Sequence, residues 1–132
     1  MNPPARSVTT LVVEDSVPVR ERLCALLMAE GCVQIVAEAG SVREGFLAFE
    51  RFRPQAVILD IGLPDGTGLD LLRQIKKAAP LCFAIVLTGF REPVFAELAR
   101  TLGADCFFHK ATEFERVTET LRALALEPPM TP

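Results

Sequence analysis

The chain has 132 residues, half of them hydrophobic, and its 14 basic and 17 acidic side chains give a formal net charge of −3. This length predicts one domain around one core, and the lack of clustered Lys and Arg argues against a nucleic-acid surface. No apolar run approaches the ~20 residues of a membrane span, and residues 1–7 carry no apolar signal core, so we expect a cytoplasmic protein with no membrane partner.

The first predicted elements are a strand, a helix and a second strand. Residues 8–13 predict a strand that ends in the apolar run Leu11-Val12-Val13, and its pattern does not alternate, as expected for a sheet covered on both faces. A helix is expected over about 16–30, with Pro18 in its first turn, where a missing N–H costs little. A second, weaker strand is predicted at 33–37.

The middle of the chain predicts a second helix and a third strand. The capping box Ser41-Val42-Arg43-Glu44 opens the helix, and Pro54 prevents its continuation. Residues 56–60 form the third strand, an apolar run that ends in Asp60. The loop at 62–68 has three glycines and a proline, and it is expected to make a specific turn.

The remaining elements continue the alternation. A third helix is expected to run to about residue 78, and 83–88 is the fourth strand. Pro93 opens a fourth helix, which places Val94, Leu98 and Leu102 on one apolar stripe and which Gly103 is expected to close. Residues 105–108 form a short fifth strand, and the capping box Thr112-Glu113-Phe114-Glu115 is expected to open the last helix.

Five strands alternating with five helices predict an α/β fold with a doubly wound parallel sheet and right-handed crossovers. The domain is expected to span 8–126, between an N-terminal tail at 1–7 and a flexible, proline-rich C-terminal tail at 127–132. Cysteines 24, 32, 82 and 106 lack the closely spaced ligand pairs of a zinc site, so we interpret them as reduced thiols.

Acidic side chains directly follow two of the predicted strands. Glu14 and Asp15 come after the first strand, and Asp60 ends the third. Ligands of doubly wound sheets bind at the carboxyl ends of the strands, so we expect the three acids to meet there. Crowded carboxylates need a cation to offset their repulsion, and an all-oxygen ligand set suits Mg²⁺. A carboxylate beside Mg²⁺ can also accept a phosphoryl group.

The chain resembles the receiver domains of two-component response regulators, the family that includes the bacterial chemotaxis regulator. The matching segments are Glu14-Asp15, the run from Asp60 to Gly68, Thr88-Gly89, and Gly103-Ala104-Asp105 leading to Lys110. Each segment alone is a weak signal, but the ordered set is specific, and it covers nearly all of 8–126. The resemblance implies a flavodoxin-like sheet with strand order 2-1-3-4-5.

The resemblance also implies site residues. Asp60 is expected to be the phosphoacceptor, with Mg²⁺ held by Glu14, Asp15, Asp60 and the backbone carbonyl of Gly62. Lys110 is expected to pair with the phosphoryl group. Asp15 also stands where it, or the following serine, would cap the first helix, and both roles are compatible.

Four further positions follow from the same resemblance. Thr88 is expected to bind a phosphoryl oxygen and, with the aromatic Phe107, to form the switch; Phe107 as an ordinary core residue is the alternative. Gly62 and Phe90 are expected to flank the phosphoryl group, and Phe90 to screen it from water.

One position departs from the family pattern. Receivers usually carry proline after the lysine, but Ala111 stands there, so a trans bond is expected and the shape of the following loop stays open. The neighbouring His109 is interpreted as a partly exposed histidine with no special role.

We therefore expect a single-domain response regulator, a switch rather than a turnover enzyme, which catalyses its own phosphorylation and dephosphorylation. The phosphodonor would be a histidine kinase or histidine phosphotransfer protein, and the fourth helix with the fifth strand and helix would face an unknown downstream protein. The protein itself is expected to be a monomer or weak dimer.

The same residues allow three alternatives. The domain could serve as a phosphate relay or sink without direct output, or as a degenerate receiver that only binds partners, against which the intact acids argue. A Mg²⁺-dependent aspartyl-phosphate phosphatase, like the haloacid dehalogenases, would need a second Asp two residues after the nucleophile. Gly62 occupies that position, which argues strongly against this enzyme.

Overall fold

The computed structural model of the protein describes residues 7–127. Its strands are β1 (Val8–Val13), β2 (Val33–Ala39), β3 (Ala56–Leu59), β4 (Gly62–Leu63), β5 (Gly66–Thr67), β6 (Phe83–Thr88) and β7 (Cys106–His109). Its helices are α1 (Val17–Met28), α2 (Val42–Phe52), α3 (Gly68–Ala78), α4 (Pro93–Thr101), α5 (Lys110–Glu113) and α6 (Arg116–Leu126). The predicted tails lie outside the described residues except for Ser7 and Glu127, which are both exposed.

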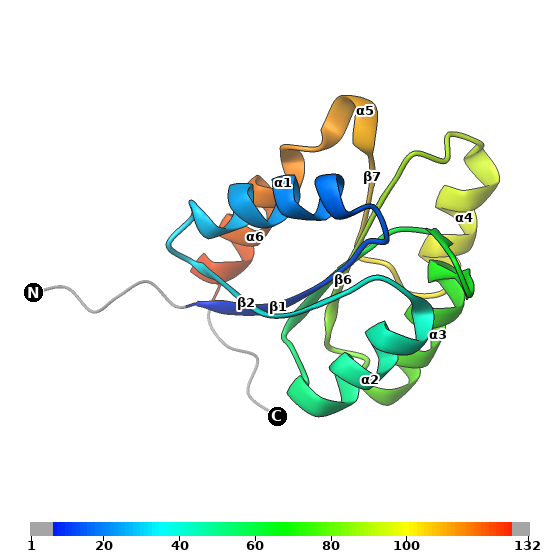
Figure 1. The fold of residues 1–132 in the computed structure, drawn as a ribbon, viewed down its shortest axis with the longest axis horizontal. Coiled ribbons are helices and arrows are strands. Elements are labelled where there is room, and N and C mark those ends of the chain that lie inside the picture. Colours follow the sequence, from blue (N-terminus) through cyan, green and yellow to red (C-terminus); the bar gives the residue numbers. More distant parts are fainter. Residues whose placement is uncertain (1–6, 128–132) are drawn as a thin grey trace, which may run out of the picture.

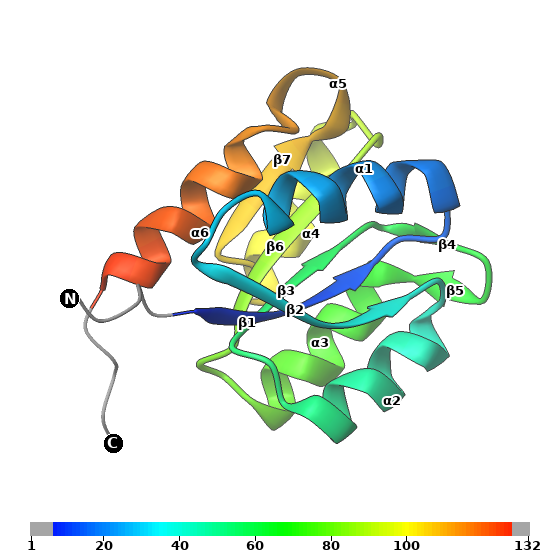
Figure 2. The ribbon, with the colours of Figure 1, turned by 60° about the vertical axis from the view of Figure 1, so that its left-hand side comes forward.

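Five strands form a parallel sheet in the order β2-β1-β3-β6-β7, which confirms the predicted order 2-1-3-4-5. Helices α1 and α6 cover one face of the sheet, and α2, α3 and α4 cover the other (Figures 1 and 2). β4 and β5 form a separate two-stranded antiparallel pair, which the sequence did not predict. Within residues 7–127, no helix combines the length and apolar character that a bilayer span needs.

Alternate residues of the central strands supply the two halves of the core. Val12 and Ile58 pack with α1 and α6, whereas the neighbouring Leu11 and Val57 pack with α2 and α3. All four side chains are almost completely buried. This two-sided burial explains why the strands are continuous apolar runs, and it gives the carboxyl ends of β1 and β3 a rigid support.

The last predicted helix is divided in two, so the fold has six helices rather than five. α5 begins at Lys110 and α6 begins at Arg116. The predicted capping box at 112–115 is wrong, because Thr112 lies within α5 and the N-cap of α6 is Glu115, which makes no side-chain cap bond. Ala111 is the physical reason: a proline there would disfavour helical backbone at Lys110, and alanine permits it. No described residue has a cis peptide bond, as expected for Ala111.

The predicted apolar stripe of α4 packs against the core only at Leu102. Val94 and Leu98 are 50% and 44% exposed. The helix buries Ala99, with Phe95 and Leu102 packed against the same core. Both apolar rows have helical spacing, and the larger Phe95 side chain lies on the row that faces the sheet. Gly103 follows the helix with φ of 103°, a conformation that favours glycine and supports its predicted role as the stop.

Helix α2 begins at a doubly capped N-terminus. Ser41 Oγ accepts from the N–H of Glu44 at 3.1 Å, as predicted. Asp65, in the turn between β4 and β5, accepts from the N–H groups of Val42 at 2.7 Å and Arg43 at 3.0 Å. Asp65 therefore attaches the loop after Asp60 to the start of α2, and it satisfies two N–H groups that have no partner within the helix.

Substitution of Asp65 by asparagine is expected to lower stability at neutral pH. Hydrogen bonds from Arg43 N–H and then Val42 N–H hold the pKa of Asp65 below its ordinary value. Its stabilising contribution is thus present above the unfolded-state pKa of about 4 and is lost as pH falls through the lower folded-state pKa. Urea unfolding across the acid range should show a smaller pH dependence in Asp65→Asn than in the wild type. A Glu50→Gln control on the exposed face of α2 should leave that dependence unchanged.

Candidate phosphoacceptor site

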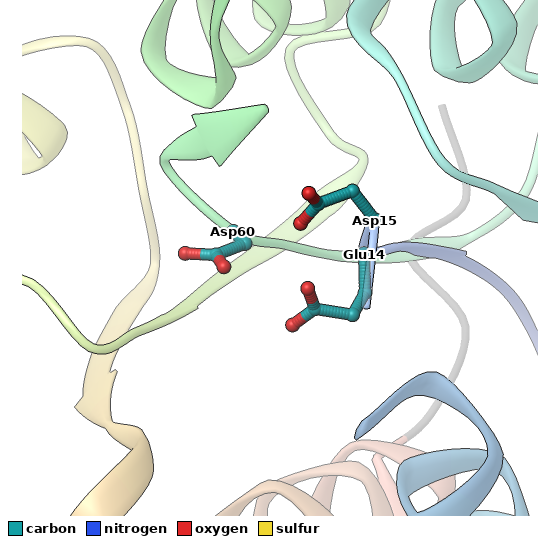
Figure 3. Close-up of side chains that lie close together, drawn as sticks. All are labelled: Glu14, Asp15 and Asp60. Carbon is teal, nitrogen blue, oxygen red and sulfur yellow. The ribbon is translucent and has the colours of Figure 1, made fainter. Parts of the chain in front are cut away.

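The three predicted acids meet at the carboxyl edge of the sheet (Figure 3). Val13 and Leu59 are register partners in β1 and β3, so the residues that follow them lie side by side. Carboxylate oxygens of Glu14, Asp15 and Asp60 all lie within 4.8 Å of one another. Glu14 and Asp60 are buried and Asp15 is exposed, so the cluster opens to solvent on one side.

Lys110 brings a positive charge to this cluster from the start of α5. Its Nζ donates to Asp60 Oδ2 at 2.6 Å and also pairs with Glu14 Oε1. Burial favours the neutral amine, but the hydrogen bonds to Asp60 and Glu14 outweigh it and raise the pKa of Lys110. Burial is also the main reason that the pKa of Glu14 is raised, and the bond from Lys110 opposes that shift. The ammonium therefore offsets part of the repulsion among the acids.

Backbone groups fix the two buried carboxylates. Asp60 Oδ1 accepts from the N–H of Ile61 at 2.7 Å. Glu14 Oε2 accepts from the N–H of Ser16 at 3.1 Å. Ser16 is also the N-cap of α1, which settles which of the two candidate residues caps that helix. These bonds leave other carboxylate lone pairs available for a ligand.

Arg20 and Gly68 also support the site. No sequence pattern indicated Arg20, and Gly68 belonged to the matching run from Asp60 without a role of its own. The guanidinium of Arg20 donates to the backbone carbonyl of Glu14 at 2.6 Å. Gly68, the first residue of α3, donates its N–H to the carbonyl of Ile61 at 2.8 Å. A β-carbon at Gly68 would lie 1.8 Å from the backbone oxygen of Asp60. The third glycine of the 62–68 loop was the available signal for this close approach.

Thr88 and Phe90 lie on the neighbouring strand end. Thr88 is fully buried, and its hydroxyl oxygen accepts from the N–H of Phe90 at 3.2 Å, which leaves the hydroxyl hydrogen free to donate elsewhere. The Phe90 ring covers Gly62, since a β-carbon at Gly62 would lie 3.2 Å from the ring. The ring also contacts Phe95, with 4.9 Å between centroids.

Phe107 lies on β7, in register with Val86 of β6. Its side chain is partly buried against the core on the α2–α4 face, and its ring meets His109 edge-on with centroids 5.5 Å apart. Phe108 is buried on the opposite face, as strand alternation predicts.

The acidic cluster fits a hard divalent cation. Its three carboxylates supply only oxygen atoms, the ligand type that Mg²⁺ prefers, and they include an exposed side chain through which an ion can enter. Gly62 lies two residues after Asp60, at the start of β4. The cysteines at 24 and 82 are buried thiols whose pKa values burial raises to about 11, so neither is poised to bind a metal as a thiolate.

Comparisons with known proteins agree with this geometry. A family model described as "Response regulator receiver domain" matches residues 10–122. Photosynthetic apparatus regulatory protein RegA of Cereibacter sphaeroides is 32% identical over 121 residues, which cover 90% of this chain and 65% of that protein. Transcriptional regulatory protein UhpA of Escherichia coli is 31% identical over 118 residues, which cover 89% of this chain and 59% of that protein. The chain therefore spans less than two thirds of either relative.

A solved structure shows the same fold. The crystal structure of a DNA-binding response regulator of the LuxR family, from Staphylococcus aureus, matches with a TM-score of 0.82 at 27% identity. The match covers 89% of this chain and 98% of that chain.

Proposed function

The chain belongs to the response regulator receiver domain family, and from that premise we propose that Asp60 accepts a phosphoryl group from a histidine kinase or a histidine phosphotransfer protein. Receiver domains of response regulators receive phosphoryl groups from histidine kinases and act as phosphoacceptor switches. The observation that carries the proposal is the convergence of Glu14, Asp15 and Lys110 on the buried carboxylate of Asp60.

In the proposed transfer, a carboxylate oxygen of Asp60 attacks phosphorus. A new oxygen–phosphorus bond forms, the bond from phosphorus to the donor's histidine nitrogen breaks, and that nitrogen keeps the electron pair. The ammonium of Lys110 and the hydroxyl of Thr88 would then bind phosphoryl oxygens. Ile61 N–H holds the attacking carboxylate in a fixed orientation, which reduces the entropy that the reaction must lose.

Glu14, Asp15 and Asp60 are the residues that would hold Mg²⁺, and the family resemblance adds the backbone carbonyl of Gly62. When bound, this ion would supply positive charge to the phosphoryl oxygens during transfer. The three carboxylates support this assignment, because one lysine cannot balance three negative charges.

Signal output is proposed to depend on Thr88 and Phe107. Movement of the Thr88 hydroxyl toward the phosphoryl group would open space for Phe107, and the surface over α4, β7 and α6 would change. Exposed Val94 and Leu98 on α4 support a protein partner at this surface. A second candidate function is a phosphate relay or sink without direct output. Because the matched relatives are longer than this chain, output through a further domain is a third candidate.

The test is incubation with acetyl phosphate and Mg²⁺, followed by intact mass measurement. The wild type should gain one phosphoryl group, and Asp60→Asn or excess chelator should abolish the gain. Rapid turnover of unrelated phosphoesters, with no stable adduct, would instead support a phosphatase. An adduct of equal yield in Asp60→Asn would refute Asp60 as the acceptor.

Substitution of Phe90 by alanine is expected to shorten the lifetime of the phosphorylated protein several-fold. The ring covers Gly62, two residues from Asp60, so its removal exposes this side of the site to water. Loss of the phosphoryl group after donor removal can be followed by intact mass. Val94→Ala, an exposed change on the adjacent helix, is the control and should keep the wild-type lifetime. Equal lifetimes in all three proteins would contradict a screening role for Phe90.

A further inference from the structure

Lys110 directly follows β7, which is an edge strand of the sheet. β7 is the last strand in the order β2-β1-β3-β6-β7, so it pairs with β6 on one side only. His109, its final residue, is in register with Thr88 and has extended backbone, and Lys110 begins α5 directly after it. The lysine has a flexible stem, so the position of its ammonium depends on how firmly this short backbone segment is held.

Glu113 holds this segment. Its Oε1 accepts from the N–H of His109 at 3.1 Å, and its Oε2 accepts from Arg116 Nη1 at 2.9 Å. The carboxylate thus bonds a backbone N–H of the edge strand and connects it to the start of α6. The bond from His109 N–H, followed by that from Arg116, holds the pKa of Glu113 below its ordinary value, so the side chain is ionised at neutral pH.

The other end of this connection is anchored in the core. Phe114, next to Glu113, is 6% exposed and packs with the α1–α6 core cluster. The guanidinium of Arg22 on α1 lies 4.3 Å from the centre of its ring. Glu113 therefore connects an anchored point to the peptide that precedes Lys110. Together, Phe114 and Glu113 constrain a loop that has no proline at position 111.

We propose that Glu113 is a positioning residue for Lys110, acting through the N–H of His109 to hold the lysine against Asp60 and Glu14. This inference rests on the proposed function of Asp60 for its consequence in phosphoryl transfer. The hydrogen bond between His109 N–H and Glu113 is present in the unphosphorylated protein. Loss of the hydrogen bond from His109 N–H to Glu113 should reduce the fraction of time that Lys110 is paired with Asp60 and Glu14. Its amine would then be more exposed, and phosphoryl transfer to Asp60 would be slower.

Three variants distinguish the effect of the side-chain length at position 113 from the effect of its charge. Glu113→Ala removes both, Glu113→Asp keeps the charge but is too short by one methylene to reach His109, and Glu113→Gln keeps an acceptor of full length without the charge. Glu115→Ala is the matched control, because Glu115 is an exposed acid two residues away that makes no side-chain cap bond. Urea unfolding of each variant establishes that the comparisons are made on folded protein.

The first readout is labelling of Lys110 in the unphosphorylated protein by an amine-acylating reagent, quantified by peptide mass spectrometry. Glu113→Ala and Glu113→Asp should label several-fold faster at Lys110, while Glu113→Gln and Glu115→Ala should match the wild type. The second readout is the rate of phosphorylation by acetyl phosphate with Mg²⁺. It should fall about tenfold in the first two variants, which is less than the roughly 100-fold that a ~1 Å misplacement of a catalytic group can cost.

Unchanged Lys110 labelling in both Glu113→Ala and Glu113→Asp would overturn the proposal. The proposal would also be overturned if Glu113→Asp labelled like the wild type and Glu113→Gln labelled faster. The charge at position 113, rather than its hydrogen bond to His109, would then hold Lys110. If the wild type acquires no phosphoryl group, the proposed function fails, and the labelling experiment still decides whether Glu113 holds Lys110. Glu113→Asp serves the same test if the alanine variant does not fold.

Discussion

Substitution of Gly68 by alanine is expected to destabilise the protein by roughly 3 kcal/mol, at the upper end of the range for overpacking. The added β-carbon would lie 1.8 Å from the backbone oxygen of Asp60, 2.8 Å from its carbonyl carbon and 3.1 Å from Leu59 Cδ1. The two closest atoms belong to backbone, so rotation of a side chain cannot relieve the clash. Either the start of α3 or the end of β3 must move.

The same displacement should disturb phosphorylation. Asp60 is held by the peptide that follows it, and Gly68 N–H bonds the carbonyl of Ile61 in that segment. We therefore expect Gly68→Ala to lose adduct formation even under conditions where it remains folded. Urea unfolding and intact mass measurement check the two effects separately.

Gly31 provides the matched control, because a β-carbon there meets nothing within 4 Å. Gly31→Ala should leave stability within about 0.5 kcal/mol of the wild type or raise it slightly, as loop glycine replacements without strain do. If Gly68→Ala also fell within that range, the close packing of α3 against Asp60 would be contradicted.

Substitution of Lys110 by alanine is expected to reduce the phosphorylation rate at least about 100-fold, the usual loss when one fixed charge-stabilising donor is removed. It should also lower stability by roughly 3 kcal/mol without metal, because Glu14 and Asp60 would stay buried without their cation. A Mg²⁺ ion at the carboxylates would replace the missing charge, so added Mg²⁺ should stabilise Lys110→Ala more than the wild type.

The pH dependence of this ion pair has a definite sign. The pKa of Lys110 is raised in the folded state, so its contribution is complete below the unfolded-state pKa of about 10.4 and is lost as pH rises through the higher folded-state value. The wild type should therefore lose more stability than Lys110→Ala at strongly alkaline pH. Lys77→Ala, at an exposed position on α3, is the control. Equal Mg²⁺ responses in all three proteins would contradict the assignment of Lys110 to the metal-binding cluster.

The sequence was sufficient to predict the sheet and the central acids. Apolar-rich segments without alternation identify strands buried on both faces, and this pattern located β1 and β6 at their observed bounds. Glu14, Asp15 and Asp60 could be placed together because parallel strands end at one edge of a sheet, a constraint that does not depend on side-chain detail.

The features that the sequence did not reveal depend on three-dimensional packing. α4 carries two apolar rows of similar spacing, and only contact with the sheet determines that Ala99 is buried while Val94 is exposed. The local pattern favoured a helix cap at Thr112, whereas the structure places Thr112 inside α5, which begins directly after the extended residue His109. Gly68 resembled an ordinary turn glycine until its distance to the Asp60 backbone was known.

The central claim is that phosphorus is transferred to one particular carboxylate. Borohydride reduction of the phosphorylated protein converts an acyl phosphate of aspartate to homoserine, and peptide mass spectrometry then locates the altered residue. We predict homoserine at position 60 alone, formed only when Mg²⁺ accompanied the donor. Homoserine at position 15, or an adduct that leaves position 60 as aspartate, would contradict the account.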